Sequence, residues 1–219
     1  MPWAKSLNSW VGPAKLNSFA GRFIGGEILR KLGDLFLISS GLVAKRKEAA
    51  PGTTGFKYKL LTLRSINALG FIEIDNLDNF LSVEEIDEKY MAKSGDIIVR
   101  LSFPFTAVVI DEQNEGTVIT SLFAILKAKN SLIDPQYVSI FLNSELMRKQ
   151  YVKDASGSAV QMIKTSSIKD YEIAIPSINK QKSTVKINEL MMRELVLLES
   201  LIEKKKIYNK MLITKLMEE

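Results

Sequence analysis

The sequence contains no cysteine and no histidine. The missing thiols exclude disulfide bonds and thiolate metal sites. The missing imidazole removes the commonest metal ligand and the usual general base near neutral pH. Much ordinary enzyme chemistry is therefore excluded, and we expect a protein without catalytic activity of its own.

Long apolar runs and nucleotide-binding motifs are also missing. Nowhere do about 18 consecutive apolar residues occur, so we expect no membrane span and a cytoplasmic protein. Gly25-Gly26 and Gly52 to Gly55 lack the spacing of phosphate-binding loops and dinucleotide fingerprints. The motifs of an adenosylmethionine-dependent amino methyltransferase, a glycine-rich loop and a polar-Pro-Pro-aromatic sequence, are absent as well. We therefore expect no cofactor.

What the chain does have is enough apolar material for a core, together with an excess of positive charge. Hydrophobic residues make up 46% of its 219 residues, which suits one or two globular domains. The formal net charge is +5. Such a charge suits a polyanionic partner, but many basic proteins have no such partner, so charge alone does not decide the function.

The last forty residues form the clearest pattern. No glycine or proline interrupts them, and apolar residues recur about every 3.6 positions, which predicts one long amphipathic helix over residues 180–219. At about 1.5 Å per residue this helix would be roughly 57 Å long, so its stripe needs a partner, which we expect to be another long helix. Lys205 interrupts the stripe, whose other members are Ile187, Met191, Leu195, Leu198, Ile202, Tyr208, Leu212 and Leu216.

The middle of the chain predicts an α+β body with a mixed sheet. Asp134-Pro135 is a typical helix start, from which we expect one helix to about Lys153. Ser82 to Glu85 has the pattern of a capping box that opens a short helix. Asp111 to Gly116 is interpreted as a hairpin loop, and Ile163 to Lys169 as a connection. The expected strands are Leu35 to Ile38, Lys59 to Ile66, Ile97 to Leu101, Ala107 to Ile110, Val118 to Leu126 and Tyr171 to Ile175.

Basic residues cluster between Gly41 and Arg64, and they are the best candidates for chemistry. The segment from Gly41 to Tyr58 has four basic residues and only one acid, Glu48, whereas Phe71 to Asp96 contains eight acids and two lysines. Lysine and arginine bind the DNA backbone through charge, although a solvated surface loop would show the same composition. The candidate phosphate-binding residues are Lys45, Arg46, Lys47, Lys57 and Arg64.

A second group of polar residues could read bases. Arg100 is a charge in an apolar strand, so it must emerge at the strand end or be paired. Ser158 and Gln161 lie in a flexible polar segment. Arginine and glutamine are among the side chains that recognise base edges in the major groove, so we expect Arg100 or Gln161 to read bases.

An acidic cluster offers an alternative chemistry, that of a magnesium-dependent nuclease. Glu84, Glu85, Asp87 and Glu88 are close in sequence, next to Lys89. Acids at the start of a short helix are favoured by its dipole and can remain solvated, which is the simpler interpretation.

Several of these pieces stand in an order that resembles the specificity subunit of type I restriction-modification systems. The resemblance covers roughly residues 31 to 217. It is carried by Leu32-Gly33-Asp34, the basic loop, Ser94-Gly95-Asp96-Ile97-Ile98, Ser121, Phe141-Leu142-Asn143-Ser144, Gly157-Ser158, Ile173 to Pro176, Gln181 and the terminal helix. The chain departs from the family at Lys180, where a glutamate is usual.

The resemblance implies a target recognition domain over residues 31–179 and a helical spacer over 180–219, after a lead-in over 1–30 of unknown role. Family members usually carry two such domains and two antiparallel helices, around which methyltransferase subunits dock. One of each suggests a homodimer, with its helices in an antiparallel coiled coil, that recognises a bipartite inverted repeat in double-stranded DNA. Its partners would be methyltransferase subunits, with or without restriction or translocase subunits. The alternative is a non-catalytic protein-binding adaptor that uses the coiled-coil arm.

Overall fold

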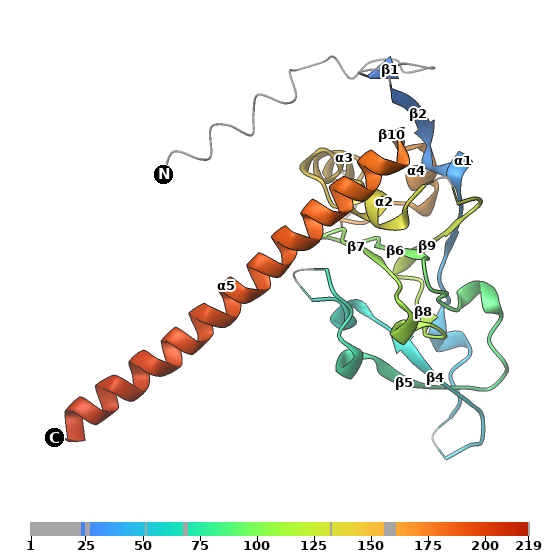
Figure 1. The fold of residues 1–219 in the computed structure, drawn as a ribbon. Helices are drawn as coiled ribbons and strands as arrows, with labels where there is room; N and C mark the ends of the chain where they lie inside the picture. Colours follow the sequence, from blue (N-terminus) through green and yellow to red (C-terminus); the bar gives the residue numbers. More distant parts are fainter. Residues whose placement is uncertain are drawn as a thin grey trace.

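The computed structural model describes residues 23–24, 27–50, 52–67, 70–131, 133–155 and 161–218. These residues form an α+β body from which a single long helix, α5 (Ile178–Glu218), extends (Figure 1). The expected α+β fold with one long carboxyl-terminal helix is thereby confirmed. Residues 1–22, which belong to the expected lead-in, lie outside the described residues.

The central sheet of the body has the strand order β3-β9-β6-β7, and every neighbouring pair is antiparallel. Side chains alternate between its faces: Ile97 and Val99 belong to one hydrophobic cluster, whereas Ile98 belongs to another. Because both faces are covered, these strands are continuously apolar. The four strands are β3 (Phe36–Ser40), β6 (Ile97–Arg100), β7 (Ala107–Val109) and β9 (Phe123–Ala128).

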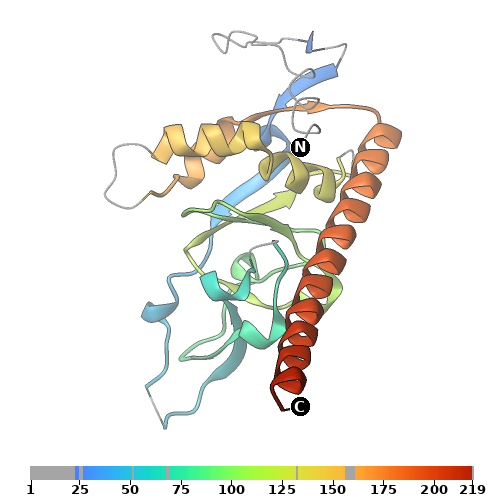
Figure 2. The same ribbon diagram turned by 90° about the vertical axis from the view of Figure 1, so that its left-hand side faces the viewer.

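Short helices cover one side of the central sheet (Figure 1, Figure 2). They are α2 (Pro135–Leu142), α3 (Glu145–Ala155) and α4 (Thr165–Asp170). The Asp134 side chain caps α2 by accepting a hydrogen bond from the backbone of Gln136 at 2.9 Å. Tyr151 of α3 is fully buried in the cluster between helices and sheet, and its hydroxyl donates to the carbonyl of Leu142 at 3.0 Å.

A second, mixed sheet lies on the other side of the body. Strand β4 (Phe56–Leu61) pairs antiparallel with β5 (Asp78–Ser82) along its length, and parallel with β8 (Val118–Ile119) only at Leu60 and Leu61. Its other end therefore extends beyond β8 as a ribbon of β4 and β5, and Glu48 pairs with Ser82 on the outer edge of β5. Five short 3-10 helices punctuate the described chain: η3 (Ala44–Arg46), η4 (Leu63–Ser65), η5 (Ile74–Asn76), η6 (Glu88–Tyr90) and η7 (Glu112–Asn114).

A third sheet connects the body to the long helix. Strand β2 (Glu27–Lys31) lies between β1 (Phe23–Ile24) and β10 (Glu172–Ile175), and it is followed at once by the short helix α1 (Leu32–Leu35). Just beyond β10, α5 begins. The buried Gln181 fixes this junction, because its side chain accepts from the Asp134 backbone at 2.9 Å and donates to the Pro176 carbonyl at 3.0 Å.

Two expectations about strands were wrong. The apolar run Val118 to Leu126 is divided between β8 and β9, which belong to different sheets, and β8 pairs with β4 instead of forming a hairpin with β7. Gly116 does make a turn there, with φ of 79°. The strand expected from Lys59 to Ile66 starts earlier and ends at Leu61, because Thr62 to Ser65 forms a 3-10 turn instead.

The helix expectations were partly wrong. Ser82 is a buried end residue of β5, paired with Phe56, so it opens no helix; the nearest helical turn is η6. The helix expected from Asp134 to Lys153 is divided into α2 and α3 at Asn143. The side chain of Asn143 accepts a hydrogen bond from the backbone N–H of Ala107 and donates one to its carbonyl. The expected connection at 163 to 169 contains α4.

Candidate nucleic-acid interface

The projecting ribbon of β4 and β5 presents lysines on its outer face. Lys57 and Lys59 are exposed, and Tyr58 between them points inward, where its hydroxyl accepts from the backbone of Ile86 at 3.1 Å. Opposite Lys59, Asn79 of β5 accepts a hydrogen bond from its ammonium group at 2.9 Å. The exposed ammonium groups give this face a charge that suits the phosphates of DNA.

The basic loop that contains η3 lies along the other edge of β5. The backbone of Ala49 donates to Leu81 at 2.8 Å, and Val83 donates to Lys47 at 2.9 Å. Lys45 and Arg46 of η3 are exposed at the surface. The loop and the ribbon thus form one continuous basic region, in which β5 separates the loop from β4.

Two of the candidate cations in this region are already paired. Lys47 forms an ion pair with Glu84, and Arg64 forms one with Asp78 of β5. The basic and acidic segments that are separate in the sequence are thus folded against each other. Within the described ranges, Lys45, Arg46 and Lys57 have no such ion pair, and they are the cations most available to phosphate.

Arg100 and Gln161 lie at one end of the central sheet. Arg100 is the last residue of β6, half-buried, and its Nε donates to Ser102 Oγ at 3.3 Å. Desolvation lowers the pKa of Arg100, but a guanidinium remains charged at neutral pH. Ser102 pairs antiparallel with Met162, which places the exposed Gln161 next to Phe103, on the side of Ser102 away from Arg100. Ser158 lies outside the described residues.

The start of the basic loop lies next to the end of the central sheet that carries Arg100. Arg100 pairs with Phe123 of β9, and Gly41 donates to the carbonyl of the same Phe123 at 3.0 Å. Arg100 and Gly41 are therefore on either side of one strand, about 10 Å apart at the usual spacing of neighbouring strands. The structure thus places Arg100 at this sheet end, with Gln161 beyond Ser102, and the loop with Lys45 and Arg46 follows directly after it.

Sequence reasoning missed Asn79 as a polar residue of this surface. Asn79 lies in the acidic segment from Phe71 to Asp96, and the composition of that segment gave no indication that one of its residues would contact the basic face. The signal that could have found it is the alternation in β5, where Phe80 and Ser82 are buried and Asn79 is exposed.

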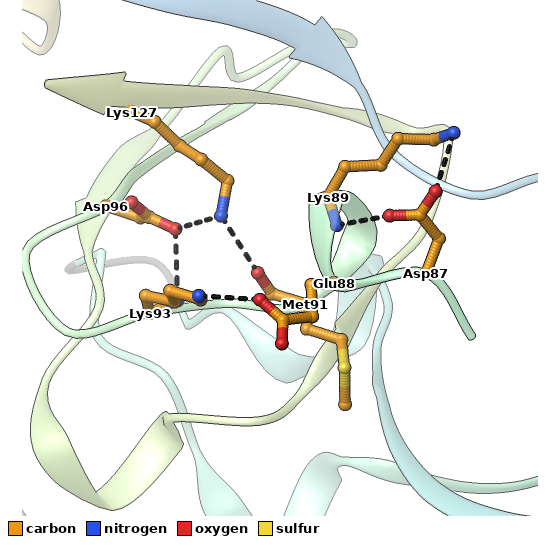
Figure 3. Close-up of polar contacts among 7 residues, drawn as sticks. All are labelled: Asp87, Glu88, Lys89, Met91, Lys93, Asp96 and Lys127. Carbon is orange, nitrogen blue, oxygen red and sulfur yellow. Dashed lines mark hydrogen bonds and ion pairs between the residues drawn. The ribbon is translucent and has the colours of Figure 1, made fainter. Parts of the chain in front are cut away.

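Three of the four acidic residues considered for a metal site are paired with lysines, Glu84 with Lys47 and the other two as follows. Asp87 pairs with Lys89, and Glu88 with Lys93, each at 2.9 Å (Figure 3). These contacts lower the pKa of both carboxyl groups, mainly through hydrogen bonds to the Lys89 backbone and the Lys93 side chain respectively. No group of three potential metal-ligating residues occurs in the part of the chain that the structure describes.

Figure 3 also shows how this segment is fixed to the central sheet. The ammonium group of Lys127, on β9, contacts the carboxylate of Asp96 at 2.9 Å and the Met91 carbonyl at 3.2 Å. Asp96 is buried and also accepts from the Lys93 backbone at 3.0 Å. These polar groups have a structural role.

Across the described ranges, no helix has the length and apolar character that a bilayer span requires.

Three solved structures have a similar fold. The HsdS subunit from Thermoanaerobacter tengcongensis matches with a TM-score of 0.61 and 14% identity, over 79% of this chain and 44% of that one. A structure that describes complex assembly and conformational transition of the type I R-M system matches with a TM-score of 0.57 and 14% identity, over 81% of this chain and 45% of that one. The type I restriction-modification S subunit from M. genitalium matches with a TM-score of 0.51 and 17% identity, over 80% of this chain and 41% of that one. The chain thus spans less than half the length of each.

A family model agrees with these folds, whereas no curated protein matches the chain. The model, described as the type I restriction modification DNA specificity domain, matches residues 29–207. That range includes the whole basic region, the sheet end with Arg100 and most of α5. The chain belongs to the family of type I restriction-modification DNA specificity domains.

Proposed function

We propose that this chain is a non-catalytic specificity subunit that binds a bipartite DNA site as a homodimer and directs methyltransferase subunits, with or without restriction subunits, to that site. Residues 31–179 would be the target recognition domain and 180–219 the spacer and dimerisation arm, acting in the cytoplasm. The observation that carries the proposal is the fixed attachment of one basic α+β body to one helix with an uncovered apolar stripe.

The exposed stripe on α5 supports the homodimer. Of the helix residues, only Gln181 is buried; from Ile187 onward the large apolar side chains are exposed in the single chain, except Met192, which is half-buried. Water contact on such a surface is unfavourable, and a second helix would remove it. The eight residues proposed for the dimer seam, which are 43 to 64% exposed, are Ile187, Met191, Leu195, Leu198, Ile202, Tyr208, Leu212 and Leu216.

A second line of apolar residues beside the seam supports the docking of partner subunits. Leu190, Leu197 and Met211 are 56, 61 and 67% exposed. Leu190 and Leu197 are seven residues apart, and Leu197 and Met211 are fourteen apart, so all three lie along one side of the helix. One partner helix cannot cover both lines, so helices of a methyltransferase subunit would cover the second.

The proposal is tested by mapping adenine methylation in cells that carry the gene and in cells from which it is deleted. Loss of one gapped, inverted motif on deletion would support it. Loss of a gapped motif with two different halves would mean that the chain acts with another recognition domain. If no motif changed although the methyltransferase was expressed, the adaptor function would replace the proposed one.

The three unpaired cations lead to a prediction about salt. Changing Lys45, Arg46 and Lys57 each to alanine should weaken binding to specific and unrelated DNA alike, because phosphate contacts carry no sequence information. The slope of log affinity against log salt concentration should fall by about one unit per lost contact. Fluorescence anisotropy over a salt series measures it.

Lys153→Ala is the matched control, since it removes the same charge from the exposed surface of α3, on the other side of the central sheet. This variant should keep the wild-type slope. An unchanged slope in the Lys45, Arg46 and Lys57 variants would remove the basic region from the DNA interface.

Arg100 leads to a different prediction, because it is expected to read a base. Arg100→Lys retains the charge but loses the forked guanidinium that binds guanine through two hydrogen bonds. Affinity for the specific site should fall about tenfold to a hundredfold, with little change for unrelated DNA. Binding titrations with both DNAs measure the ratio, and an equal loss on both would make Arg100 a phosphate contact.

A further inference from the structure

The charges that flank the stripe of α5 define how two copies of the helix can pair. With Leu195, Ile202 and Asn209 at position a of a heptad, Leu198, Lys205 and Leu212 fall at position d. Positions e and g then border the seam. Position e is occupied by Met192, Glu199, Lys206 and Ile213, and position g by Glu194, Leu201, Tyr208 and Lys215.

A parallel, in-register pair would be unfavourable. It would place Lys205 against Lys205 of the second copy inside the apolar seam, where a desolvated charge without a partner is costly. It would also place Glu194 at position g beside Glu199 at position e of the second copy, which is a pair of like charges. Parallel pairing is thus disfavoured both inside and beside the seam.

An antiparallel pair has a register in which these conflicts disappear. When Ile202 packs against Lys205 of the second copy, Leu195 packs against Leu212, Met191 against Leu216 and Leu198 against Asn209. Reversal of one helix brings e against e and g against g. Glu199 then faces Lys206, and Glu194 faces Lys215, and each pair occurs twice by symmetry. The apolar border residues also meet one another: Leu201 with Tyr208, and Met192 with Ile213.

Registers displaced by one heptad lose this complementarity. Displacement in one direction places Lys206 against Lys206 of the second copy, and displacement in the other places Glu199 against Glu199. Like charges directly opposite each other are unfavourable, and polar residues in a seam, here Lys205 and Asn209, commonly fix its register. Lys205 has this role, because in the favoured register its stem packs on Ile202 while its ammonium group can extend toward Glu199 of the second copy.

The body leaves this part of the helix free. In the favoured register the paired segment runs from about Glu189 to Glu218. The fixed contacts of α5 with the body occur at its start, through the buried Gln181, and Ile187 is already 60% exposed. Two bodies would therefore be held at opposite ends of the coiled coil.

We infer that a second copy of this chain packs antiparallel along α5 in the register that opposes Ile202 to Lys205, with Glu199 to Lys206 and Glu194 to Lys215 as the pairs that select it. This inference rests on the proposed homodimer. It adds to that proposal the register of the antiparallel helices and the residues that select it.

Cysteine cross-linking tests the register cleanly because the sequence has no cysteine. The double variant Leu198→Cys with Asn209→Cys should form a disulfide-linked dimer on oxidation, since these positions face each other across the seam. Leu198→Cys with Ile202→Cys and Leu198→Cys with Leu216→Cys report the two displaced registers, and Leu198→Cys alone reports parallel pairing. Non-reducing gel electrophoresis should show a covalent dimer mainly for the first variant.

Charge exchange tests the selecting pair without altering the apolar seam. Glu199→Lys and Lys206→Glu should each weaken the dimer about tenfold, because each creates two like-charge pairs, and the double variant should restore it. Sedimentation gives the dissociation constants. A wild-type chain that stays monomeric would overturn the homodimer itself; a dimer that cross-links through another cysteine variant, or that the double exchange does not rescue, would overturn only the register.

Discussion

Replacing both Leu198 and Ile202 with aspartate is expected to give a monomeric protein that no longer distinguishes its DNA site from other sequences. Both side chains lie in the exposed stripe of α5, 47 and 55% exposed in the single chain. In a dimer they would be buried in the middle of the seam. The variant would have to bury carboxylates there or leave the seam open to water.

The expected effect on dimerisation is large. Burial of one leucine or isoleucine side chain contributes about 1.5 to 3 kcal/mol, and the two substitutions remove four such side chains from a symmetric dimer. The aspartates add a desolvation cost. The dissociation constant should therefore rise by at least about a thousandfold, and specific DNA binding should fall with it because each monomer contacts only one half of the site.

A control on the opposite side of the helix separates dimerisation from a general effect of charge on α5. Val196 and Ile207 are 44 and 56% exposed and lie about half a turn away from the proposed seam. Changing both to aspartate should leave the dimer intact in light scattering and sedimentation. If the Leu198 and Ile202 double variant also remained dimeric with wild-type DNA affinity, the stripe would not be the seam.

The extent of α5 could be predicted from the sequence because it depends on local features alone. It contains no glycine or proline, and its apolar spacing follows the helix period over the whole segment, so the structure has a single helix from Ile178 to Glu218. Strands β6 and β10 were predictable for a similar reason, as short apolar runs bounded by turn residues.

The sheet arrangement could not be predicted because it depends on distant partners. The backbone of Leu42 accepts from Ser121 at 2.8 Å and donates to Ile119 at 2.7 Å, which helps to separate β8 from β9 within one apolar run. Likewise, composition revealed the basic region but not which cations are neutralised. The acid that pairs with Lys47 is 37 positions away, and no local pattern connects the two.

Gly41→Ala is expected to destabilise the body strongly, by about 3 kcal/mol. A methyl group on Gly41 would lie 2.5 Å from the carbonyl oxygen of Ile119 and closer still to that of Thr120, well inside van der Waals contact. Both oxygens belong to backbone that cannot easily move, since the Ile119 oxygen accepts from Leu42 at 2.7 Å and the Thr120 oxygen accepts from Phe123 at 3.0 Å.

The strain would act where the basic loop leaves the central sheet, so the loss of stability should be accompanied by weaker DNA binding. Gly52→Ala is the contrasting variant: its φ of 82° makes alanine unfavourable by about 1 kcal/mol, but no atom lies within 4 Å of the added methyl group. Thermal unfolding should therefore separate the two variants clearly. Equal melting temperatures would show that the backbone around Gly41 can open without cost, and the junction would then not hold the loop in place.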